Sequence, residues 1–209
     1  MNGLFITFEG TEGGGKSTQI TILADRFRQL GRAVRLLREP GGTPIGEEIR
    51  HTLKHSPANH AMTPETELLL MNASRAQLVR EVIRPALAAG EVVLCDRFFD
   101  STLAYQGHGR GLDQDQVTRV IDFAVGDTRP HLTLLLRVPV AVSEARRAAR
   151  GAAQRDRFEE ADRAFFERVE WGYDAIAAAE PTRIKKIDAT QSIAAVAGDI
   201  WKQVEPLAR

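Results

Sequence analysis

Hydrophobic and polar positions follow two periods along the chain, and segments with one period alternate with segments with the other. Short, mostly apolar runs are typical of strands that are covered on both faces, whereas apolar residues spaced three or four positions apart are typical of amphipathic helices. The predicted strands lie at 3–8, 33–37, 91–95, 131–136 and 183–187. The predicted helices lie at 16–30, 44–55, 63–90, 113–125, 140–150, 161–179 and 192–204.

Strands and helices alternate over almost the whole length, which predicts an α/β fold. We expect a five-stranded parallel sheet wrapped by helices, with right-handed crossovers between the strands. A chain of 209 residues suits one domain, and no repeat, low-complexity tract or linker interrupts it. Residues 1–209 are therefore predicted to form a single domain.

A glycine-rich loop joins the first predicted strand to the first predicted helix. Its sequence is Gly10-Thr11-Glu12-Gly13-Gly14-Gly15-Lys16-Ser17-Thr18, which fits the phosphate-loop (Walker A) pattern G-x-x-x-x-G-K-[ST]. The backbone N–H groups of such a loop and the positive end of the following helix hold phosphate oxygens. We expect the loop to bind ATP, with Lys16 on the outer phosphates and the Ser17 hydroxyl on Mg²⁺. The motif alone does not distinguish a kinase from a GTPase or an ATPase.

Charged residues follow the second and third predicted strands, at the sheet edge where open α/β sheets bind ligands. Arg38 and Glu39 begin a segment rich in glycine and proline, and Asp96 and Arg97 follow the third strand. Asp96 is placed like an acid that reaches Mg²⁺, and the Arg97 guanidinium can hold a phosphate through two hydrogen bonds. A surface ion pair is the simpler interpretation, but the neighbouring phosphate loop favours a site. Hydroxyl and amide side chains then follow at turn-like spacing over 100–107.

A small, glycine-containing segment at about 148–158 is rich in arginine. It contains Arg150, Arg155 and Arg157, directly after Arg147 of the preceding predicted helix. One interpretation is a solvated charged loop. The other, which the phosphate loop favours, is a mobile lid that brings an arginine over the transferred phosphoryl group.

Composition limits the class of protein further. The 28 Lys and Arg residues balance the 28 Asp and Glu residues, so we expect neither nucleic acid nor a membrane surface as a partner. Cys95 is the one cysteine and lies in an apolar run, which predicts a core residue. His51, His55 and His60 have no cysteine or carboxylate set beside them, so we expect surface histidines. The sequence shows no signal peptide and no apolar run of about 18 residues, and we expect a cytoplasmic protein.

With these segments in place, the chain resembles the bacterial type of thymidylate kinase over nearly its whole length. The resemblance rests on the segments 8–18, 38–43, 96–107 and 156–159. It implies the nucleoside monophosphate kinase variant of the phosphate-loop NTPase fold, with strand order 2-3-1-4-5, and a homodimer. It also implies transfer of the γ-phosphoryl group of MgATP to dTMP, which yields dTDP and ADP for dTTP synthesis.

The resemblance further implies roles for individual residues. Glu12 is expected near the 3′-hydroxyl of dTMP, Arg38 and Arg97 at its phosphate, and Arg75 at the thymine edge. The expected dTMP-binding residues are Glu12, Arg38, Glu39, Met71, Arg75, Arg97, Thr102, Tyr105 and Gln106. The expected catalytic residues are Lys16, Arg97, Arg150, Arg155 and Arg157, and the expected Mg²⁺ ligands are Ser17 and Asp96.

Met71 is the main departure from the pattern of this family, in which many members place a phenylalanine that stacks on thymine. A methionine can still pack on a ring face, but its presence leaves open a kinase for another nucleotide or deoxynucleoside, such as dCMP. A phosphate-loop ATPase or binding module is a second alternative, and it leaves Arg97 and the lid arginines unexplained. A GTPase is expected to carry an N-K-x-D motif, which the sequence lacks.

Overall fold

The structure is a computed structural model, and it describes residues 3–148, 157 and 161–208. Within these residues, strands pair in parallel to form one sheet in the order β2-β3-β1-β4-β5. The strands are β1 (Leu4–Glu9), β2 (Val34–Arg38), β3 (Val92–Asp96), β4 (Leu132–Arg137) and β5 (Ile184–Asp188). The predicted parallel α/β sheet is confirmed, together with the strand order that the resemblance implied.

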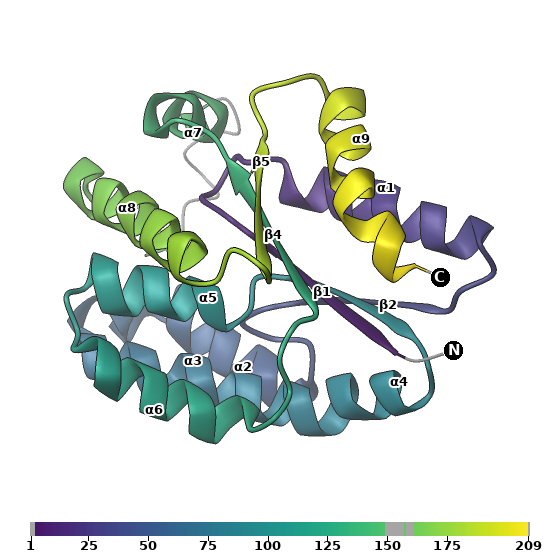
Figure 1. The fold of residues 1–209 in the computed structure, drawn as a ribbon. Helices are drawn as coiled ribbons and strands as arrows, with labels where there is room; N and C mark the ends of the chain where they lie inside the picture. Colours follow the sequence, from purple (N-terminus) through teal and green to yellow (C-terminus); the bar gives the residue numbers. More distant parts are fainter. Residues whose placement is uncertain (1–2, 149–156, 158–160, 209) are drawn as a thin grey trace.

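Helices cover both faces of the sheet, as Figure 1 shows. One face carries α1 (Lys16–Gln29) and α9 (Ile193–Val204). The helices on the other face are α3 (Pro64–Leu78), α4 (Arg84–Ala88), α5 (Phe99–Thr102), α6 (Gln114–Val125) and α8 (Arg163–Ala179). In addition, α2 (Pro44–Lys54) packs against α3, and α7 (Val140–Ala148) follows β4. None of the helices in the described residues is long and apolar enough to cross a membrane.

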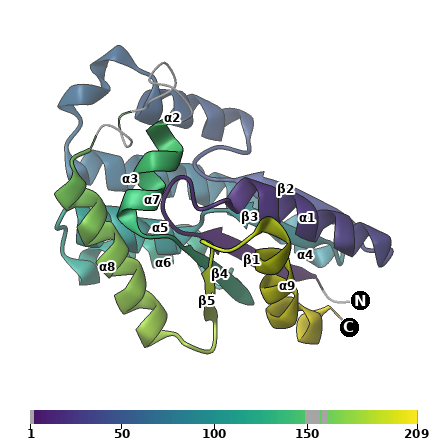
Figure 2. The same cartoon turned by 90° about the horizontal axis from the view of Figure 1, so that it is seen from above.

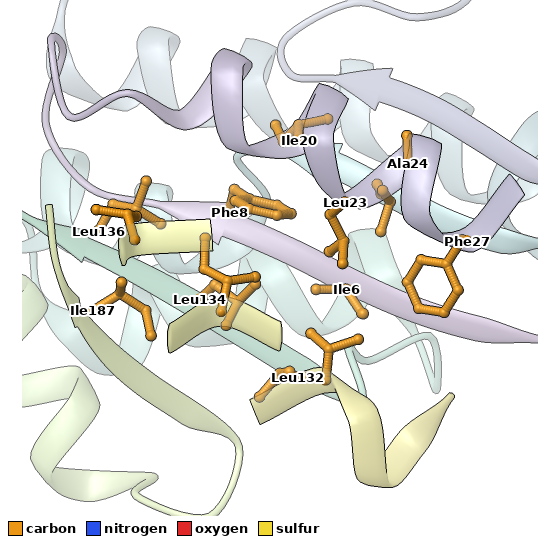
Figure 3. Close-up of a cluster of buried hydrophobic side chains, with 14 of the residues drawn as sticks. Ile6, Phe8, Ile20, Leu23, Ala24, Phe27, Leu132, Leu134, Leu136 and Ile187 are labelled. Carbon is orange, nitrogen blue, oxygen red and sulfur yellow. The ribbon is translucent and has the colours of Figure 1, made fainter. Parts of the chain in front are cut away.

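Burial on both faces explains why the strands are apolar throughout. All residues of β1 are buried, since side chains of alternate residues point to opposite helix layers. Figure 3 shows Ile6 and Phe8 of β1 packed between α1 and the neighbouring strand β4. On the opposite face, Phe5 packs with Cys95 against α3 and α6. Cys95 is therefore a core residue, as predicted.

Side-chain caps explain where several helices begin. Thr43 Oγ1 accepts a hydrogen bond from the backbone N–H of Gly46, and Thr63 Oγ1 accepts one from Thr66, in both cases with a proline in the first turn. Asp113 caps α6 in the same way. Such a cap stabilises a helix by about 1 kcal/mol. These local signals are why the helix starts were predictable from sequence.

Two segments differ in detail from the predicted pattern. The helix expected over 63–90 is not uniform, because a π-helical turn at Val79–Ile83 separates α3 from α4. Pro85 at the start of α4 has no N–H to donate to the preceding turn, so a regular α-helical ladder cannot continue through it. The hydroxyl and amide side chains at 100–107, for which no helix was predicted, lie in a helical segment, with α5 followed by a π-helical stretch at Leu103–Gly109.

Candidate active site

The phosphate loop leaves β1 at a point where only glycine fits. A Cβ atom on Gly10 would lie 2.3 Å from the carbonyl oxygen of Leu136 on the adjacent strand β4. Gly13 and Gly15 have φ angles of 79° and 83°, in the region that glycine adopts without steric cost. The loop can therefore curl tightly at the start of α1, where N–H groups and the helix dipole favour phosphate.

Two side chains of α7 hold the phosphate loop from outside. Ser143 Oγ donates a hydrogen bond of 2.6 Å to the Glu12 carbonyl, and Arg146 Nη1 donates one of 3.0 Å to the Gly13 carbonyl. Seen from above, the loop lies beside α7 (Figure 2). The loop is thus fixed by a helix more than a hundred positions away in the sequence.

Lys16 lies inside the loop that it follows. Its Nζ donates to the carbonyls of Gly10 and Thr11 at 3.0 and 3.1 Å, and only 6% of the residue is exposed. Burial lowers the pKa of Lys16, and the charge of Arg97 lowers it further. Ser17 and Thr18, by contrast, are exposed in the first turn of α1. A phosphate at this helix end would meet a compact charge already in position.

Asp96 fits the role of an Mg²⁺ ligand. It ends β3 directly beside the end of β1, and its Oδ1 is buried with no hydrogen-bond partner among the described residues. A buried carboxylate oxygen without a donor is costly, and a hard cation with oxygen ligands would satisfy it. The exposed Ser17 hydroxyl supplies a second oxygen of the expected kind.

A pocket lies beside the phosphate loop, and the predicted acceptor residues line it. It contains Glu12, Glu39, Met71, Arg75, Arg97, Thr102, Tyr105 and Gln106, which are all the predicted dTMP residues except Arg38. Sequence reasoning assigned no binding role to the remaining lining residues, which are Pro40, Lys54, Phe98, Ser101 and Phe166, although Pro40, Phe98 and Ser101 lie in the segments that carry the resemblance. Phe166 belongs to the apolar pattern of a helix, so its sequence context could not separate it from core residues.

The helical form of 99–109 explains how four of these residues reach one pocket. Ser101, Thr102, Tyr105 and Gln106 line the pocket together. On a helix, residues three to five positions apart share a face, whereas a turn would spread them. The π-helical stretch that begins at Leu103 is of a kind often found at functional sites.

Arg97 joins the pocket to the phosphate loop. Its Nη2 donates to Glu12 Oε1 at 3.0 Å and to the Tyr105 hydroxyl at 3.3 Å, and its Nη1 donates to Ser101 and Tyr173 at 3.1 and 3.2 Å. Its φ angle is 70°, which is strained for a non-glycine residue and is typical of functional sites. Burial would raise the pKa of Glu12, but the charges of Lys16 and Arg97 outweigh it and hold that pKa well below its ordinary value.

Arg75 is almost completely buried and supports other residues of the pocket wall. Its Nε donates to Glu39 at 2.8 Å, its Nη1 to Asn72 and Thr102 at 2.9 Å each, and its Nη2 to the Phe98 carbonyl at 3.1 Å. Every guanidinium nitrogen therefore has a protein acceptor in this structure. Burial raises the pKa of Glu39, and the charge of Arg75 opposes the rise.

Four predicted residues lie outside the pocket or are not described. Arg38 ends β2 and forms a two-point ion pair with Glu47, with N–O distances of 2.7 and 3.1 Å. Arg157 donates to the carboxylate of Glu67 and lies 3.7 Å from the Met62 sulfur. Arg150 and Arg155, with most of the predicted lid at 148–158, fall outside the described residues.

Glu9 is a buried acid that sequence reasoning did not assign to the site. Its carboxylate accepts hydrogen bonds from the Phe98 N–H at 2.7 Å, from Ser101 Oγ at 2.5 Å and from the Tyr173 hydroxyl at 3.0 Å. Burial, assisted by the charge of Asp100, raises the pKa of Glu9 to about 7, although these hydrogen bonds and Arg97 oppose the rise. A charged residue at the end of an otherwise apolar strand was the available signal.

The fold and the site together define a class of protein. A phosphate loop beside a pocket with charged walls, at the carboxyl ends of a parallel sheet in the order 2-3-1-4-5, is the arrangement of a phosphate-loop nucleoside monophosphate kinase. The chain belongs to the thymidylate kinase family, whose sequence model matches residues 8–200. It is an ATP-dependent phosphotransferase that acts on dTMP, and Mg²⁺ accompanies the ATP.

Relatives match the chain from end to end. The thymidylate kinase of Pseudomonas syringae pv. tomato is 52% identical over 207 residues, which cover 99% of this chain and 97% of that protein. The thymidylate kinase of Pseudomonas savastanoi pv. phaseolicola is 54% identical over 196 residues, covering 94% and 92%. The crystal structure of thymidylate kinase from Ehrlichia chaffeensis superposes with a TM-score of 0.79 at 31% identity, covering 97% and 98% of the two chains.

The raised pKa of Glu9 predicts a pH-dependent stability. Between the ordinary value of 4.5 and the folded value of about 7, the folded chain holds this proton more tightly than the unfolded chain does. Stability from this group is therefore fully present below the ordinary value and lost as pH rises through the folded value. From about pH 5 to about pH 8, the free energy of unfolding should fall by roughly 2 kcal/mol more in the wild type than in Glu9→Gln.

Urea unfolding of both proteins across this range measures the difference. The Ser101 and Tyr173 hydroxyls can accept as well as donate, so the new amide keeps its partners. Glu65→Gln, at an exposed position, is the control and should follow the wild type. Equal slopes for Glu9→Gln and the wild type would contradict the assignment.

Proposed function

We propose that the chain transfers the γ-phosphoryl group of MgATP to dTMP between the phosphate loop and the pocket described above, with the residue roles given below. One observation carries this assignment. The guanidinium of Arg97 lines the pocket and also pairs with Glu12 of the phosphate loop, so one partly buried cation serves both sites. An ATPase or a binding module needs no second pocket joined to its phosphate loop.

The donor half consists of the loop amides, Lys16, Ser17 and Asp96. The amides and Lys16 hold the β- and γ-phosphates, and Ser17 and Asp96 provide oxygen ligands for Mg²⁺. When bound, Mg²⁺ neutralises charge on the phosphate oxygens. Lys16 donates to the carbonyls of Gly10 and Thr11. These two hydrogen bonds keep its ammonium group where the outer phosphates bind.

The acceptor half places the dTMP phosphate at Arg97. Its two-point geometry suits a phosphate, and Arg38 adds a second guanidinium by exchanging Glu47 for the substrate. Glu12 approaches the 3′-hydroxyl. A phosphate monoester is already ionised near neutral pH, so the reaction requires positioning and charge neutralisation and needs no general base.

The part of the acceptor pocket that holds the base, here called the base half of the pocket, comprises Met71, Arg75, Thr102, Tyr105 and Gln106. Glu39 lies behind Arg75. Arg75 presents the Thr102 hydroxyl to the pocket, because a guanidinium only donates and leaves the hydroxyl hydrogen for the ligand. Met71 packs its sulfur on the ring face in place of an aromatic side chain. An arginine of the lid (Arg150, Arg155 or Arg157) neutralises charge on the moving phosphoryl group.

We further propose a homodimer of single-domain subunits of residues 1–209, with the lid at about 148–158, located in the cytoplasm where its nucleotide substrates occur. The exposed apolar surface of α6 supports the dimer. Phe123 on α6 is 84% exposed, which is exceptional for a phenylalanine, and α6 packs directly against α3. Burial of this ring in an interface between two chains would remove its apolar surface from water.

The acceptor assay tests the function directly. Purified protein with MgATP should release ADP rapidly with dTMP, more slowly with dUMP and little with dCMP, dGMP or no acceptor. Lys16→Ala should lower turnover with dTMP by about 100-fold or more, because a charge that stabilises the transferred group is lost. A higher rate with another nucleotide would reassign the base pocket, and equal ADP release in all tubes would mean an ATPase.

Replacing Arg97 tests the acceptor half. Arg97→Ala should raise the KM for dTMP about 10- to 100-fold, as expected for a charge-assisted hydrogen-bond pair, and should change the KM for ATP far less. Arg35→Ala, which removes an arginine paired with Glu91 outside the pocket, should leave both KM values unchanged. A rise in the ATP value alone would show that donor and acceptor roles have been exchanged.

The dimer is tested by light scattering after size exclusion. The wild type should have the mass of two chains, and Phe123→Ser should shift it toward the mass of one. Leu30→Ser removes another exposed apolar side chain, 54% exposed, at the end of α1 on the opposite face of the sheet and should remain dimeric. A monomeric wild type, or a Phe123→Ser protein of unchanged mass, would contradict this interface.

A further inference from the structure

Glu67 is a fully buried carboxylate behind the base half of the pocket. It lies in the first turns of α3 and has no exposed surface. It does not line the pocket. Its Oε1 accepts a hydrogen bond of 2.7 Å from Gln106 Nε2. A buried charge is costly, so its presence behind a ligand pocket calls for a reason.

Two arginines satisfy the rest of this carboxylate. Arg110 donates through Nε and Nη2 at 3.3 and 3.2 Å, and Arg157 donates to Oε2. The Arg110 guanidinium also packs over the Phe165 ring of α8, 4.6 Å from its centre. Four N–H donors therefore contact Glu67, and in each of these contacts its carboxylate is the acceptor.

The contact with Glu67 decides which way the Gln106 amide faces. A carboxylate in this setting only accepts, so it must meet the NH₂ end of the amide. The amide is planar with its oxygen and nitrogen on opposite sides, so the oxygen is left for the pocket that Gln106 lines. Without Glu67, either end of the amide could face the ligand.

The neighbouring residue Thr102 is oriented by the same kind of rule. Its Oγ1 accepts from Arg75 at 2.9 Å, so its hydroxyl hydrogen is left to donate. The pocket thus combines an acceptor from Gln106 with a donor from Thr102. This pair matches an imide edge, an N–H beside a C=O, which thymine and uracil have. Cytosine carries a ring-nitrogen acceptor where thymine has its N–H, and this acceptor would face the Gln106 oxygen, which can only accept.

We propose that Glu67 is a positioning residue for base selection: it fixes the Gln106 amide with its oxygen toward the base, so that the pocket accepts imide bases and rejects cytosine. The proposal rests on the proposed function and deepens it. Glu67 acts through Gln106 and touches no substrate. Its effect belongs to base recognition and not to phosphoryl transfer.

Glu67→Gln tests the proposal because it keeps the shape of the side chain but replaces one acceptor oxygen with an NH₂ group that donates hydrogen bonds. With Arg110 and Arg157 still donating, the new amide turns its oxygen to them and its NH₂ to Gln106, which must then reverse. Steady-state kinetics with MgATP and dTMP, dUMP or dCMP measure the result, with dCMP also followed as a competitive inhibitor. The KM for dTMP and for dUMP should rise together by about tenfold or more, and the preference over dCMP should narrow, while the KM for ATP is unchanged.

Asp100→Asn is the matched control. Asp100 is also buried, 1% exposed, and pairs with an arginine, Arg183, at 2.7 Å, but it does not line the pocket. It should lower the free energy of unfolding without changing the preference for dTMP over dCMP. If Asp100→Asn narrows that preference as much as Glu67→Gln does, or if Glu67→Gln leaves the KM for dTMP unchanged, the proposal is overturned.

The exchange Glu67→Gln with Gln106→Glu supplies a rescue that a structural role would not predict. A carboxylate at position 106 presents acceptors to both sides, so the KM for dTMP should recover at least about threefold from the single variant. No recovery overturns the orientation argument. Should Glu67→Gln fail to fold, Glu67→Asp tests the proposal instead. The aspartate keeps a negative charge for the arginines, but its shorter side chain moves the carboxylate away from the Gln106 amide. It should raise the KM for dTMP without changing that for ATP, and unchanged values overturn the proposal.

The outcomes separate this proposal from the proposed function. A wild-type protein that phosphorylates neither dTMP nor dUMP would remove the function and the inference together. A wild type that prefers dTMP, with Glu67 variants that bind it equally well, would remove the inference alone.

Discussion

The buried carboxylate of Glu9 is the constraint on which the rest of the site depends. It ends the central strand β1 and binds the Phe98 backbone, Ser101 and Tyr173. These contacts join the exits of β1 and β3 to α5 and α8. The same Ser101 and Tyr173 hydroxyls accept from Arg97. Removing one partner from such a cluster leaves the others buried without partners, which is costly.

Arg97 shows what that support is for. A positively charged side chain held at a strained φ angle needs surroundings that determine its position. Glu12 on one side and the tyrosine hydroxyls on the other provide them. The guanidinium therefore lies between the phosphate loop and the pocket, fixed by protein groups, and preorganisation of this kind lowers the cost of charge neutralisation during transfer.

The pocket wall follows one design, in which a buried charge orients a neutral group. Arg75, paired with Glu39, orients the Thr102 hydroxyl, and Glu67, paired with Arg110, orients the Gln106 amide. Neutral groups alone could rotate or flip, since a hydroxyl or amide can donate or accept. Forming these buried ion pairs costs free energy of desolvation. In exchange, the pocket presents a defined pattern of hydrogen-bond donors and acceptors to the base.

The sequence by itself determined the elements whose signals are local. The two hydrophobic periods predicted the parallel sheet and its helices, and the glycine spacing at 10–15 predicted the phosphate loop. The residues following β2 and β3 were also predictable, because parallel strands end at one edge. The lid arginines Arg150 and Arg155 remain predictions, since they lie outside the described residues.

Only the tertiary structure decided which charged groups meet. Glu67 lies 39 positions from Gln106, and Glu9 lies 164 positions from Tyr173. The resemblance implied a role for Arg75 at the base edge, and the structure adds its protein partners Glu39, Thr102 and Phe98. It also adds the pairing of Arg38 with Glu47. The hydrophobic periodicity of a sequence indicates whether a side chain is buried, but it does not indicate which other residues bury it. Hydrogen-bond partners and shifted pKa values depend on how distant segments pack, and no local pattern in the chain encodes them.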